Sequence, residues 1–342
     1  MKVQEFAYDL PPELIAQHPP RERDGGRLMQ LSRGASSAPV HGRIVDLPRL
    51  LAPGTLMVVN DSRVIPARLW ARRESGGRVE LLLLERLGPQ GDQERWSCMI
   101  RSSKTPGAGE RLRLERAEAA VTLVERPVQG RCELLLDADV PGRFGSIPLP
   151  PYIRRPDDTT DRERYQTVYA EAEGSVAAPT AGLHFTGALL SRLEAVGVEL
   201  ARVTLHVGPG TFQPVRAEIV EQHRMEQERY VVPPRTASAI RRAKSEGRPV
   251  LAVGTTVVRT LEASGGAAGE GRTELFIAPG YRFQVVDQLL TNFHLPRSTL
   301  LMLVAAFTGR VPMMAAYAEA VRERYRFYSY GDAMLITSAE QP

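Results

Sequence analysis

Two short segments carry the residues best suited to chemistry. Residues 176–185 read VAAPTAGLHF and residues 204–215 read TLHVGPGTFQPV. Each sets a histidine, His184 or His206, beside small, hydroxyl or Gly/Pro residues, a composition that suits a loop exposing backbone N–H groups to a ligand. For either segment alone, an ordinary turn with an incidental histidine is the alternative. Together with a third such segment further on, they predict two walls of one site.

Polar segments also follow several predicted strands, at 206–212, 254–259 and 292–299. Open α/β sheets bind ligands at the carboxyl ends of their strands, so we expect these segments to meet at one edge. Gly254-Thr-Thr256 also opens a predicted helix, whose free N–H groups suit a carboxylate or a phosphate. The alternative there is a plain threonine cap.

Three histidines invite a metal hypothesis, because His184, His206 and His294 could form a three-histidine zinc site. However, the chain has no His-Glu-x-x-His pair and lacks acidic neighbours for these rings. We therefore expect no metal. The sequence also has no Gly-x-Ser-x-Gly elbow, no Walker loop and no Gly-x-Gly-x-x-Gly after a strand. This argues against a serine hydrolase, ATP hydrolysis and hydride transfer.

Composition and charge narrow the class of protein. Of 342 residues, 43% are hydrophobic and 25% are charged, as in soluble globular proteins. No run approaches the roughly 18 apolar residues of a membrane span, and the N-terminal segment has no apolar signal region. We expect a cytoplasmic protein with no membrane contact. Only Lys2, Lys104 and Lys244 among the 44 basic residues are lysines; the arginine bias reflects either genome composition or phosphate contact.

The fold predicted from patterning is α/β with an inserted β-barrel. A chain of this length normally forms two domains. Residues 56–149 read as short strands separated by turn residues, typical of a small antiparallel barrel. Residues 1–55 and 150–342 fit one α/β domain with a mostly parallel sheet. The expected helices are 187–195, 235–246, 255–263, 298–307 and 313–325, and the expected strands of this domain include 198–206, 229–232, 250–253, 275–277, 289–293 and 333–336, with a flexible glycine-rich loop at 265–271.

Seven further segments, together with the two opening ones and in order from end to end, extend the pattern beyond single motifs. The further segments are FAYDLPPELIAQH at 6–18, NDSRVIPAR at 60–68, LPPYIR at 149–154, YQTVY at 165–169, AVGTT at 252–256, TNFHLP at 291–296 and YRFYSYGDAM at 325–334; of the opening segments, 176–185 and 204–215, the run APTAGLHF at 178–185 is especially specific. On these segments the chain resembles the S-adenosylmethionine:tRNA ribosyltransferase-isomerase family of queuosine biosynthesis. The resemblance implies an α/β domain with an inserted barrel, which agrees with the patterning.

The family's reaction would consume S-adenosylmethionine as a substrate, with no further cofactor. Its ribosyl part would move to the aminomethyl nitrogen of 7-aminomethyl-7-deazaguanine at the wobble position of a tRNA with a GUN-type anticodon. Rearrangement would give epoxyqueuosine, with release of adenine and methionine. We expect a monomer whose partners are this tRNA and S-adenosylmethionine.

This chemistry suggests roles without fixing them. A base must remove a proton from the ribose carbon next to the sulfonium, and neutral imidazole titrates in the right range, so the candidates are His184, His206 and His294. Asp332 could protonate adenine or deprotonate the attacking amine. The expected substrate-binding residues are Thr180, Gly182, Gly208, Gly210, Thr211, Phe212, Gln213, Gly254, Thr255, Thr256, Arg259, Asn292, Phe293 and Tyr330. Among them, Arg259 or the two threonines suit the methionine carboxylate, and Phe212, Phe293 or Tyr330 could stack on a base or the sulfonium.

The anticodon loop is the expected tRNA target, because its unstacked bases can enter a pocket. Arg63, Arg68 and Arg154 are the expected phosphate contacts. Two other classes stay open: a histidine-centred metallohydrolase and a non-catalytic RNA-binding module carried by the barrel.

Overall fold

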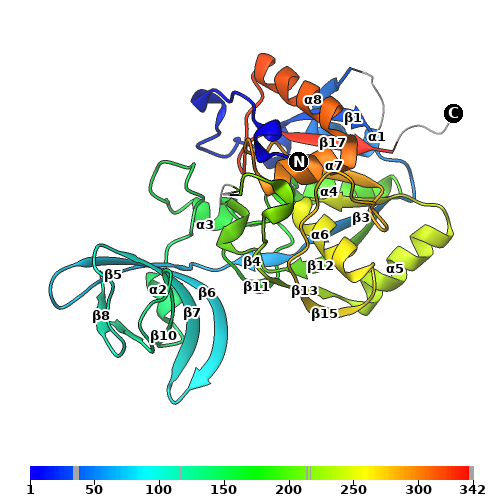
Figure 1. Cartoon of the computed structure of the whole chain (residues 1–342). Helices are drawn as coiled ribbons and strands as arrows, with labels where there is room; N and C mark the ends of the chain where they lie inside the picture. Colours follow the sequence, from blue (N-terminus) through cyan, green and yellow to red (C-terminus); the bar gives the residue numbers. More distant parts are fainter. Residues whose placement is uncertain (34–37, 116, 213–214, 216, 339–342) are drawn as a thin grey trace.

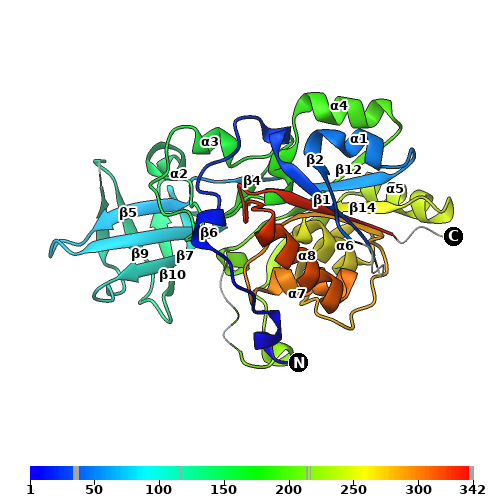
Figure 2. The same ribbon diagram turned by 90° about the horizontal axis from the view of Figure 1, so that it is seen from above.

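The computed structural model describes residues 1–33, 38–115, 117–212, 215 and 217–338. Its two parts lie side by side: a large sheet covered by helices, and a small barrel that projects from it (Figure 1). Figure 2 shows the same separation from above, with the barrel at one end and α5 at the other.

The larger part is built on one sheet that has nine strands within the described residues, in the order β15-β13-β12-β3-β14-β16-β17-β1-β2. Four neighbouring pairs are parallel and four are antiparallel. The sheet is therefore mixed, which corrects the expectation of a mostly parallel one. In sheet order its strands are β15 (Gly269–Thr273), β13 (Glu228–Val232), β12 (Glu199–Leu205), β3 (Leu56–Asn60), β14 (Val250–Val253), β16 (Gln288–Asn292), β17 (Ala333–Thr337), β1 (Arg27–Ser32) and β2 (Val40–Arg43).

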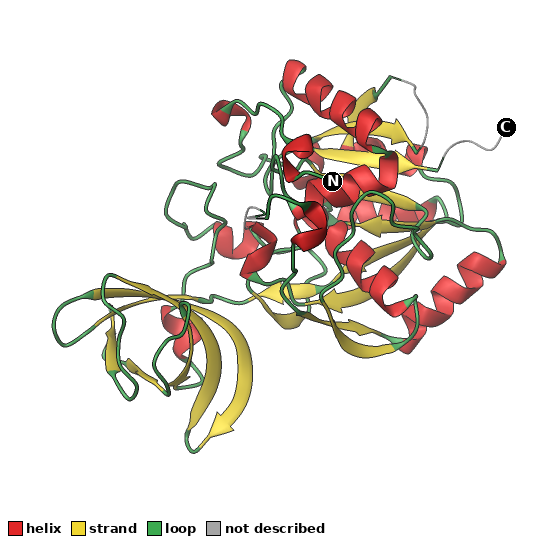
Figure 3. Ribbon diagram, in the orientation of Figure 1, coloured by secondary structure: helices red, strands yellow, loops and turns green. Residues whose placement is uncertain are grey.

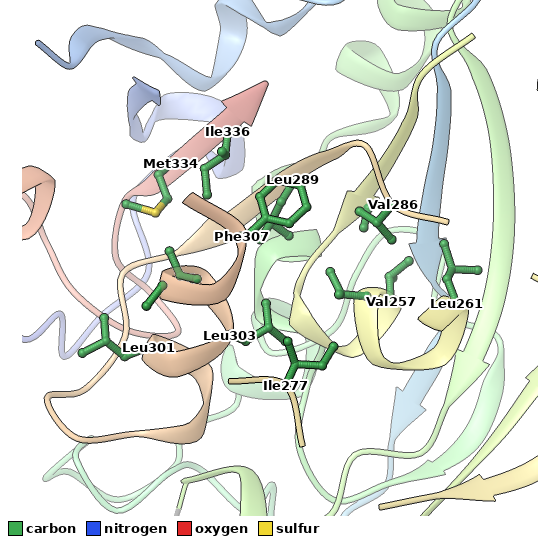
Figure 4. Packing of buried hydrophobic residues seen from close by; sticks show 14 of the residues in the cluster. Val257, Leu261, Ile277, Val286, Leu289, Leu301, Leu303, Phe307, Met334 and Ile336 are labelled. Carbon is green, nitrogen blue, oxygen red and sulfur yellow. The ribbon is translucent and has the colours of Figure 1, made fainter. Parts of the chain in front are cut away.

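Helices cover both faces of this sheet, so its central strands are apolar on both sides. In β3, Leu56 and Val58 pack toward one face, while Met57 and Val59 pack toward the other. Figure 4 shows the first of these cores, where Val257, Leu303 and Phe307 meet Leu289 of the sheet. The helices on that face are α5 (Pro234–Ser245), α6 (Thr255–Ser264), α7 (Thr299–Thr308) and α8 (Arg310–Arg322); those on the other are α1 (Leu47–Leu50) and α4 (Gly187–Ala195).

The smaller part is a closed barrel with its own core. Its strands alternate buried and exposed side chains, as in Arg131–Leu136, because only one side of each strand faces the barrel interior. Cys98 and Cys132 lie opposite each other on neighbouring strands. Both are buried free thiols, as expected. In order around the barrel the strands are β10 (Arg131–Leu136), β7 (Gln93–Ser102), β6 (Arg78–Gln90), β5 (Arg68–Arg72), β8 (Arg111–Leu114) and β9 (Ala120–Leu123).

The barrel is an insertion, but it does not begin at residue 56 as expected. β3 lies in the middle of the large sheet, and the first barrel strand starts at Arg68. Between them, β4 (Ser62–Val64) pairs in parallel with β11 (Ala172–Ser175), a strand that follows the return from the barrel. The outgoing and returning chains themselves meet at an antiparallel bridge between Arg68 and Ser146. The short helices α2 (Val140–Phe144) and α3 (Asp161–Arg164) lie on the return path (Figure 3).

Most of the expected elements lie within a few residues of their predicted ranges. Two expectations differ: residues 275–277 form no strand, and β15 begins at Gly269 inside the expected glycine-rich loop. The strands β1, β2, β4, β5 and β11 were not predicted. In the described part of the chain, no single helix is long and apolar enough to cross a membrane, although α7 and α8 meet that criterion when taken together across their 117° bend. The remaining turns are the 3-10 helices η1 (Val3–Phe6), η2 (Pro12–Leu14), η3 (Arg23–Gly25), η4 (Ile44–Asp46), η5 (Thr180–His184), η6 (Pro209–Phe212) and η7 (Val220–Gln222).

Candidate active site

The expected meeting of strand ends is confirmed. β12, β3, β14 and β16 run parallel to one another, so Leu205, Asn60, Val253 and Asn292 end at the same edge of the sheet. Gly254 and the segment after β16 follow at that edge, as does His206. The chain thus brings polar residues from four separate segments to one side of the molecule.

A buried polar network holds this edge together. The Asn60 side chain accepts hydrogen bonds from the N–H groups of Ser62 (3.1 Å) and Leu205 (3.0 Å), and its amide donates to the Leu205 carbonyl (3.0 Å). Ser175 donates to the Ser62 hydroxyl (2.8 Å) and accepts from the N–H of Val207 (3.0 Å). Sequence reasoning did not assign these residues to the site. Their signal was a polar Asn-Asp-Ser run directly after an apolar strand.

The two histidine-bearing segments also touch. The N–H groups of Val176 and Ala177 both donate to the carbonyl of Val207, at 2.9 and 3.2 Å. The two segments therefore form adjoining walls, as expected. Their histidines, however, lie on different sides of this contact: His206 faces the barrel, and His184 lies beside Asn292.

A cleft of about 1210 Å³ lies between the barrel and the large sheet. This exceeds the roughly 300–1,000 Å³ of a pocket for one small ligand. The cleft has room for a small molecule together with a nucleotide. From the larger part it is lined by Gly174, His206, Val207, Gly208, Pro209 and Arg229, and from the barrel and its return path by Leu84, Glu85, Trp96, Arg131, Asp139 and Arg162, among others.

Carboxylates line this cleft as well, which the sequence did not reveal. Glu85 and Glu94 come from the barrel, and Glu173, Glu226 and Glu228 come from the larger part. They are scattered over the sequence and share no motif, so only the fold brings them together. They place acidic groups in the same cleft as His206, and Glu85 acts on the pKa of its ring.

His206 is the histidine that lines this cleft. Its Nδ1 is buried and has no hydrogen-bond partner in the described part of the chain. Burial lowers the pKa of His206, and the positive charge of Arg229 lowers it further, while Glu85 acts in the opposite direction. The ring is therefore neutral at neutral pH and can accept a proton.

The glycine loop after His206 is held by a buried ion pair. Glu228 accepts a hydrogen bond from the N–H of Gly208 (2.9 Å) and pairs with the Arg259 guanidinium. Arg259 also donates from Nε to the carbonyl of Leu275 (3.0 Å) and is almost fully buried. Arg259 is thus already paired with a carboxylate of the chain, while its Nη2 is buried without a hydrogen-bond partner among the described residues. The expectation that Arg259, or Thr255 and Thr256, binds the methionine carboxylate stays a prediction.

His184 lies outside the cleft, in a small recess at the other end of the same edge. Its Nε2 is 3.2 Å from the amide nitrogen of Asn292, and burial lowers the pKa of His184 to about 4. Asp332 is also buried there and accepts hydrogen bonds from the N–H groups of Arg27 (2.9 Å) and Arg326 (2.8 Å). These bonds give Asp332 a role in holding the backbone.

His294 does not converge with the other two histidines. Its Nε2 is 2.9 Å from the Thr291 hydroxyl, and Tyr8 donates to its carbonyl. Thr291 and Asn292 are successive strand residues and point to opposite faces of the sheet. His294 and His184 therefore lie on opposite faces, and burial lowers the pKa of His294 to about 3. Among the described residues, no group of three or more His, Cys, Asp or Glu could hold a metal ion.

The amino end of α6 is covered rather than open. Gly254 adopts a positive φ of 91°, and a Cβ there would stand 3.4 Å from Cβ of Ala181 in η5. Thr255 and Thr256 are buried beneath this contact. Gly182 packs still more closely, since a Cβ would lie 2.2 Å from the Tyr169 hydroxyl. Thr180 starts the same turn, so η5 forms a cap over the sheet edge and gives no open anion site there.

Three expected stacking residues are placed differently. Phe293 is fully buried and packs against Tyr317, Tyr325 and Phe327, which contradicts a stacking role on a ligand. Tyr330 is buried, and its hydroxyl donates to Asp161 (2.8 Å), although it borders the recess beside His184. Gly210, Thr211 and Phe212 belong to η6, and Gln213 lies outside the described residues.

The three arginines expected to contact tRNA differ in their exposure and in the partners that their side chains have. Arg68 is paired with Glu80 (3.1 Å), which leaves little net charge for a phosphate. Arg63 is exposed, and its guanidinium donates to the carbonyl of Ala170 (2.8 Å). Arg154 is exposed, and in the described structure only its backbone N–H makes a hydrogen bond, to Gln17 (2.8 Å).

Known proteins match this chain along nearly its whole length. The sequence model of a family described as "Queuosine biosynthesis protein" matches residues 3–336. The S-adenosylmethionine:tRNA ribosyltransferase-isomerase of Geobacter sulfurreducens is 54% identical over 98% of this chain and 100% of its own length. The protein of the same name from an Anaeromyxobacter species is also 54% identical, over 99% and 100%.

A solved structure agrees with these sequence relatives. The crystal structure of S-adenosylmethionine tRNA ribosyltransferase from Thermotoga maritima is 38% identical, covers 97% of this chain and 99% of its own, and superposes with a TM-score of 0.55. The chain therefore belongs to the S-adenosylmethionine:tRNA ribosyltransferase-isomerase family and is a transferase and isomerase of queuosine biosynthesis.

Proposed function

We propose that this enzyme moves the ribosyl group of S-adenosylmethionine to 7-aminomethyl-7-deazaguanine at the wobble position of a tRNA with a GUN-type anticodon. The product is epoxyqueuosine, and adenine and methionine are released. S-adenosylmethionine is consumed and no other cofactor takes part. We further propose that the enzyme acts as a monomer in the cytoplasm.

The observation that carries this proposal is the cleft between the barrel and the sheet. Its volume of about 1210 Å³ suits S-adenosylmethionine together with one extruded nucleotide, and a neutral histidine lines it. An extruded anticodon base is more accessible than one inside a duplex. A site shared between two parts of the chain can take the small substrate from one side and the RNA from the other.

His206 is the base that this geometry favours. The sulfonium acidifies the neighbouring ribose carbon, and removal of its proton starts the expulsion of adenine. His206 lines the cleft in its neutral form, whereas His184 and His294 are buried outside it. A positioned general base contributes about 10²- to 10⁴-fold to a rate. Glu85, Glu173 and Glu226 are the nearby candidates for the steps that protonate adenine or deprotonate the attacking amine.

The test compares His206→Asn with His184→Asn. Each variant is incubated with S-adenosylmethionine and tRNA carrying 7-aminomethyl-7-deazaguanine, and released adenine is measured by chromatography. We expect His206→Asn to lose at least 100-fold in adenine release while it still binds S-adenosylmethionine. His184→Asn should keep far more activity. Wild-type rates in His206→Asn would remove His206 as the base.

The overall reaction has a separate test. Wild-type enzyme with both substrates should yield adenine, methionine and epoxyqueuosine in equal amounts. If folded enzyme yields none of the three, the proposed reaction is wrong. Turnover that survives a strong chelator would separate it from a metallohydrolase, and RNA affinity without turnover would favour a binding module.

A further inference from the structure

Two arginines join the N-terminal loop to α3 in a reciprocal contact, called here the arginine clasp. Arg23 donates to the carbonyls of Gln166 and Glu163, both at 2.8 Å. Arg164 donates in return to the carbonyls of Arg21 (3.1 Å) and Pro20 (2.6 Å). Each guanidinium thus binds the backbone of the segment that carries the other.

The clasp keeps its positive charge, because backbone carbonyls do not neutralise a guanidinium. Among the described residues, neither Arg23 nor Arg164 forms an ion pair within 4.0 Å. The nearby carboxylates have other partners. Glu22 is 3.9 Å from Arg21, and Asp24 accepts a hydrogen bond from the Thr186 hydroxyl (3.1 Å). The carboxylate of the exposed Glu163 acts in the opposite direction and raises the pKa of Arg23.

Two further observations point to an anion at the clasp. Burial lowers the pKa of Arg23, and the neighbouring charge of Arg164 lowers it further, so the two guanidinium groups repel each other. Moreover, Nε of Arg164 is buried and has no hydrogen-bond partner in the part of the chain that the structure describes. A bound anion would relieve the repulsion and give this N–H an acceptor.

The recess at the clasp limits the size of that anion. It is lined by both arginines together with His184, Ser329 and Tyr330. Its volume of about 10 Å³ admits a single water-sized atom group. A phosphate could insert one oxygen and stay at the mouth, whereas a nucleoside or a whole amino acid could not enter.

The clasp is connected to the cleft through α3. Arg162, on the same helix, lines the cleft and donates to the carbonyl of Gly145 (3.1 Å). It too forms no ion pair among the described residues. α3 lies between the barrel and the large sheet (Figures 1 and 2). Three arginines that form no ion pair among the described residues therefore lie along a path from the recess over α3 to the cleft, with Glu163 as an exposed carboxylate between them.

We propose that Arg23, Arg162 and Arg164 bind successive phosphates of the tRNA strand whose wobble nucleotide enters the cleft. This proposal rests on the proposed function, which makes tRNA the partner. The planar guanidinium suits phosphate oxygens, and three arginines on a short path match a repeating polyanion better than a single free anion.

The test measures the salt dependence of tRNA binding. A fluorescently labelled transcript of a tRNA with a GUN anticodon is titrated with enzyme at several salt concentrations. The variant Arg162→Gln/Arg164→Gln should bind at least tenfold more weakly, and the slope of log affinity against log salt should flatten by about 1.5, since each phosphate contact contributes roughly 0.7–0.9. The matched control is Arg235→Gln/Arg241→Gln, which removes two exposed charges from α5 at the far end of the sheet.

Variants that keep the charge separate binding from folding. Arg162→Lys/Arg164→Lys should retain most of the slope, and its circular dichroism should match the wild type. At the level of turnover, the glutamine variant should raise KM for tRNA far more than it lowers kcat. An unchanged slope in the folded glutamine variant would overturn the proposal.

The RNA path can fail independently of the proposed reaction. If inorganic phosphate binds the clasp tightly but Arg162→Gln/Arg164→Gln leaves the tRNA affinity unchanged, the recess binds a free anion and the proposal is wrong. If the slope is unchanged but wild-type enzyme still releases adenine, only the RNA path is wrong. If tRNA binds through the clasp but no adenine is released, the proposed reaction is wrong instead.

Discussion

Gly174 lies against the imidazole of His206, so closely that a Cβ on Gly174 would stand 3.0 Å from Nδ1 and 3.1 Å from Cε1. Gly174 has a φ of 135° and sits where the register between β4 and β11 shifts. An irregular strand thus forms the surface on which the ring rests. The orientation of His206 depends on a backbone that only glycine adopts easily.

Gly174→Ala should therefore displace the ring without unfolding the enzyme. The added methyl group meets the imidazole, and the positive φ adds strain of about 1–3 kcal/mol. We expect at least a tenfold loss of adenine release with nearly unchanged affinity for S-adenosylmethionine. Gly187→Ala is the matched control, because nothing lies within 4 Å of its Cβ position at the start of α4. Equal rates in both variants would show that the ring position does not limit the reaction.

Breaking the buried pair of Arg259 and Glu228 should destabilise the enzyme strongly. Arg259→Met removes one partner of a buried ion pair, a change that typically costs about 3–5 kcal/mol. The exposed pair of Arg242 and Glu199 offers a comparison, since surface pairs contribute about 0–1 kcal/mol. Urea unfolding measures both. A similar small loss in Arg259→Met and Arg242→Met would contradict the importance of the buried pair.

Acid should destabilise the fold before the carboxylates titrate. His184 has a pKa of about 4 and His294 of about 3 in the folded state, against about 6.5 in an unfolded chain. The unfolded state therefore binds more protons below pH 6.5, and stability falls as pH drops from there toward the folded values. The expected slope is up to about 1.4 kcal/mol per pH unit for each histidine.

Unfolding free energies at pH 7.5, 6.5, 5.5 and 5.0 measure this effect. His294→Gln should reduce the slope of unfolding free energy against pH by the contribution of one histidine. This holds even if the substitution changes the unfolding free energy itself. A stability that stays constant down to pH 5 would contradict the burial of both rings.

Two exposed ion pairs bridge the cleft and should control its width. Arg131 on the barrel pairs with Glu226, and Arg272 on β15 pairs with Glu85 of the barrel. Glu226→Arg should place two like charges across the cleft and raise the KM for both substrates, with little change in stability. The exchanged pair, Arg131→Glu/Glu226→Arg, should recover much of the loss if the contact itself matters. No recovery would show that the contact does not matter, and would assign the effect to the new charge or to the loss of the Glu226 carboxylate from the cleft.

The sequence predicted the fold where its signal was local. Alternating side chains in 131–136 correctly indicated a barrel strand, and strand ends followed by glycine and threonine correctly indicated one polar edge. The assignment of 56–59 to the barrel was wrong. This segment was grouped with the short strands that follow it in the sequence, although its own continuous apolar run differs from their alternating pattern. Such a run indicates a strand covered on both faces, and β3 has helices on both sides.

The site was harder to predict because its residues depend on long-range packing. Phe293 and His206 both follow strands next to polar residues, yet one is fully buried in the core and the other lines the cleft. Which neighbours cover a strand end is set by segments far away in the chain, such as η5. Likewise, Glu228 and Arg259 are 31 residues apart and share no motif, so their pairing appears only in three dimensions.

The pairing of β4 with β11 also links the barrel to the histidine. Ser62 lies opposite Ala172 and Val64 lies opposite Ser175, so the strand that carries Gly174 is hydrogen-bonded to the chain that leads into the barrel. β4 ends at Val64 and the first barrel strand begins at Arg68. A displacement of the barrel would therefore act, within a few residues, on the strand that supports the His206 imidazole.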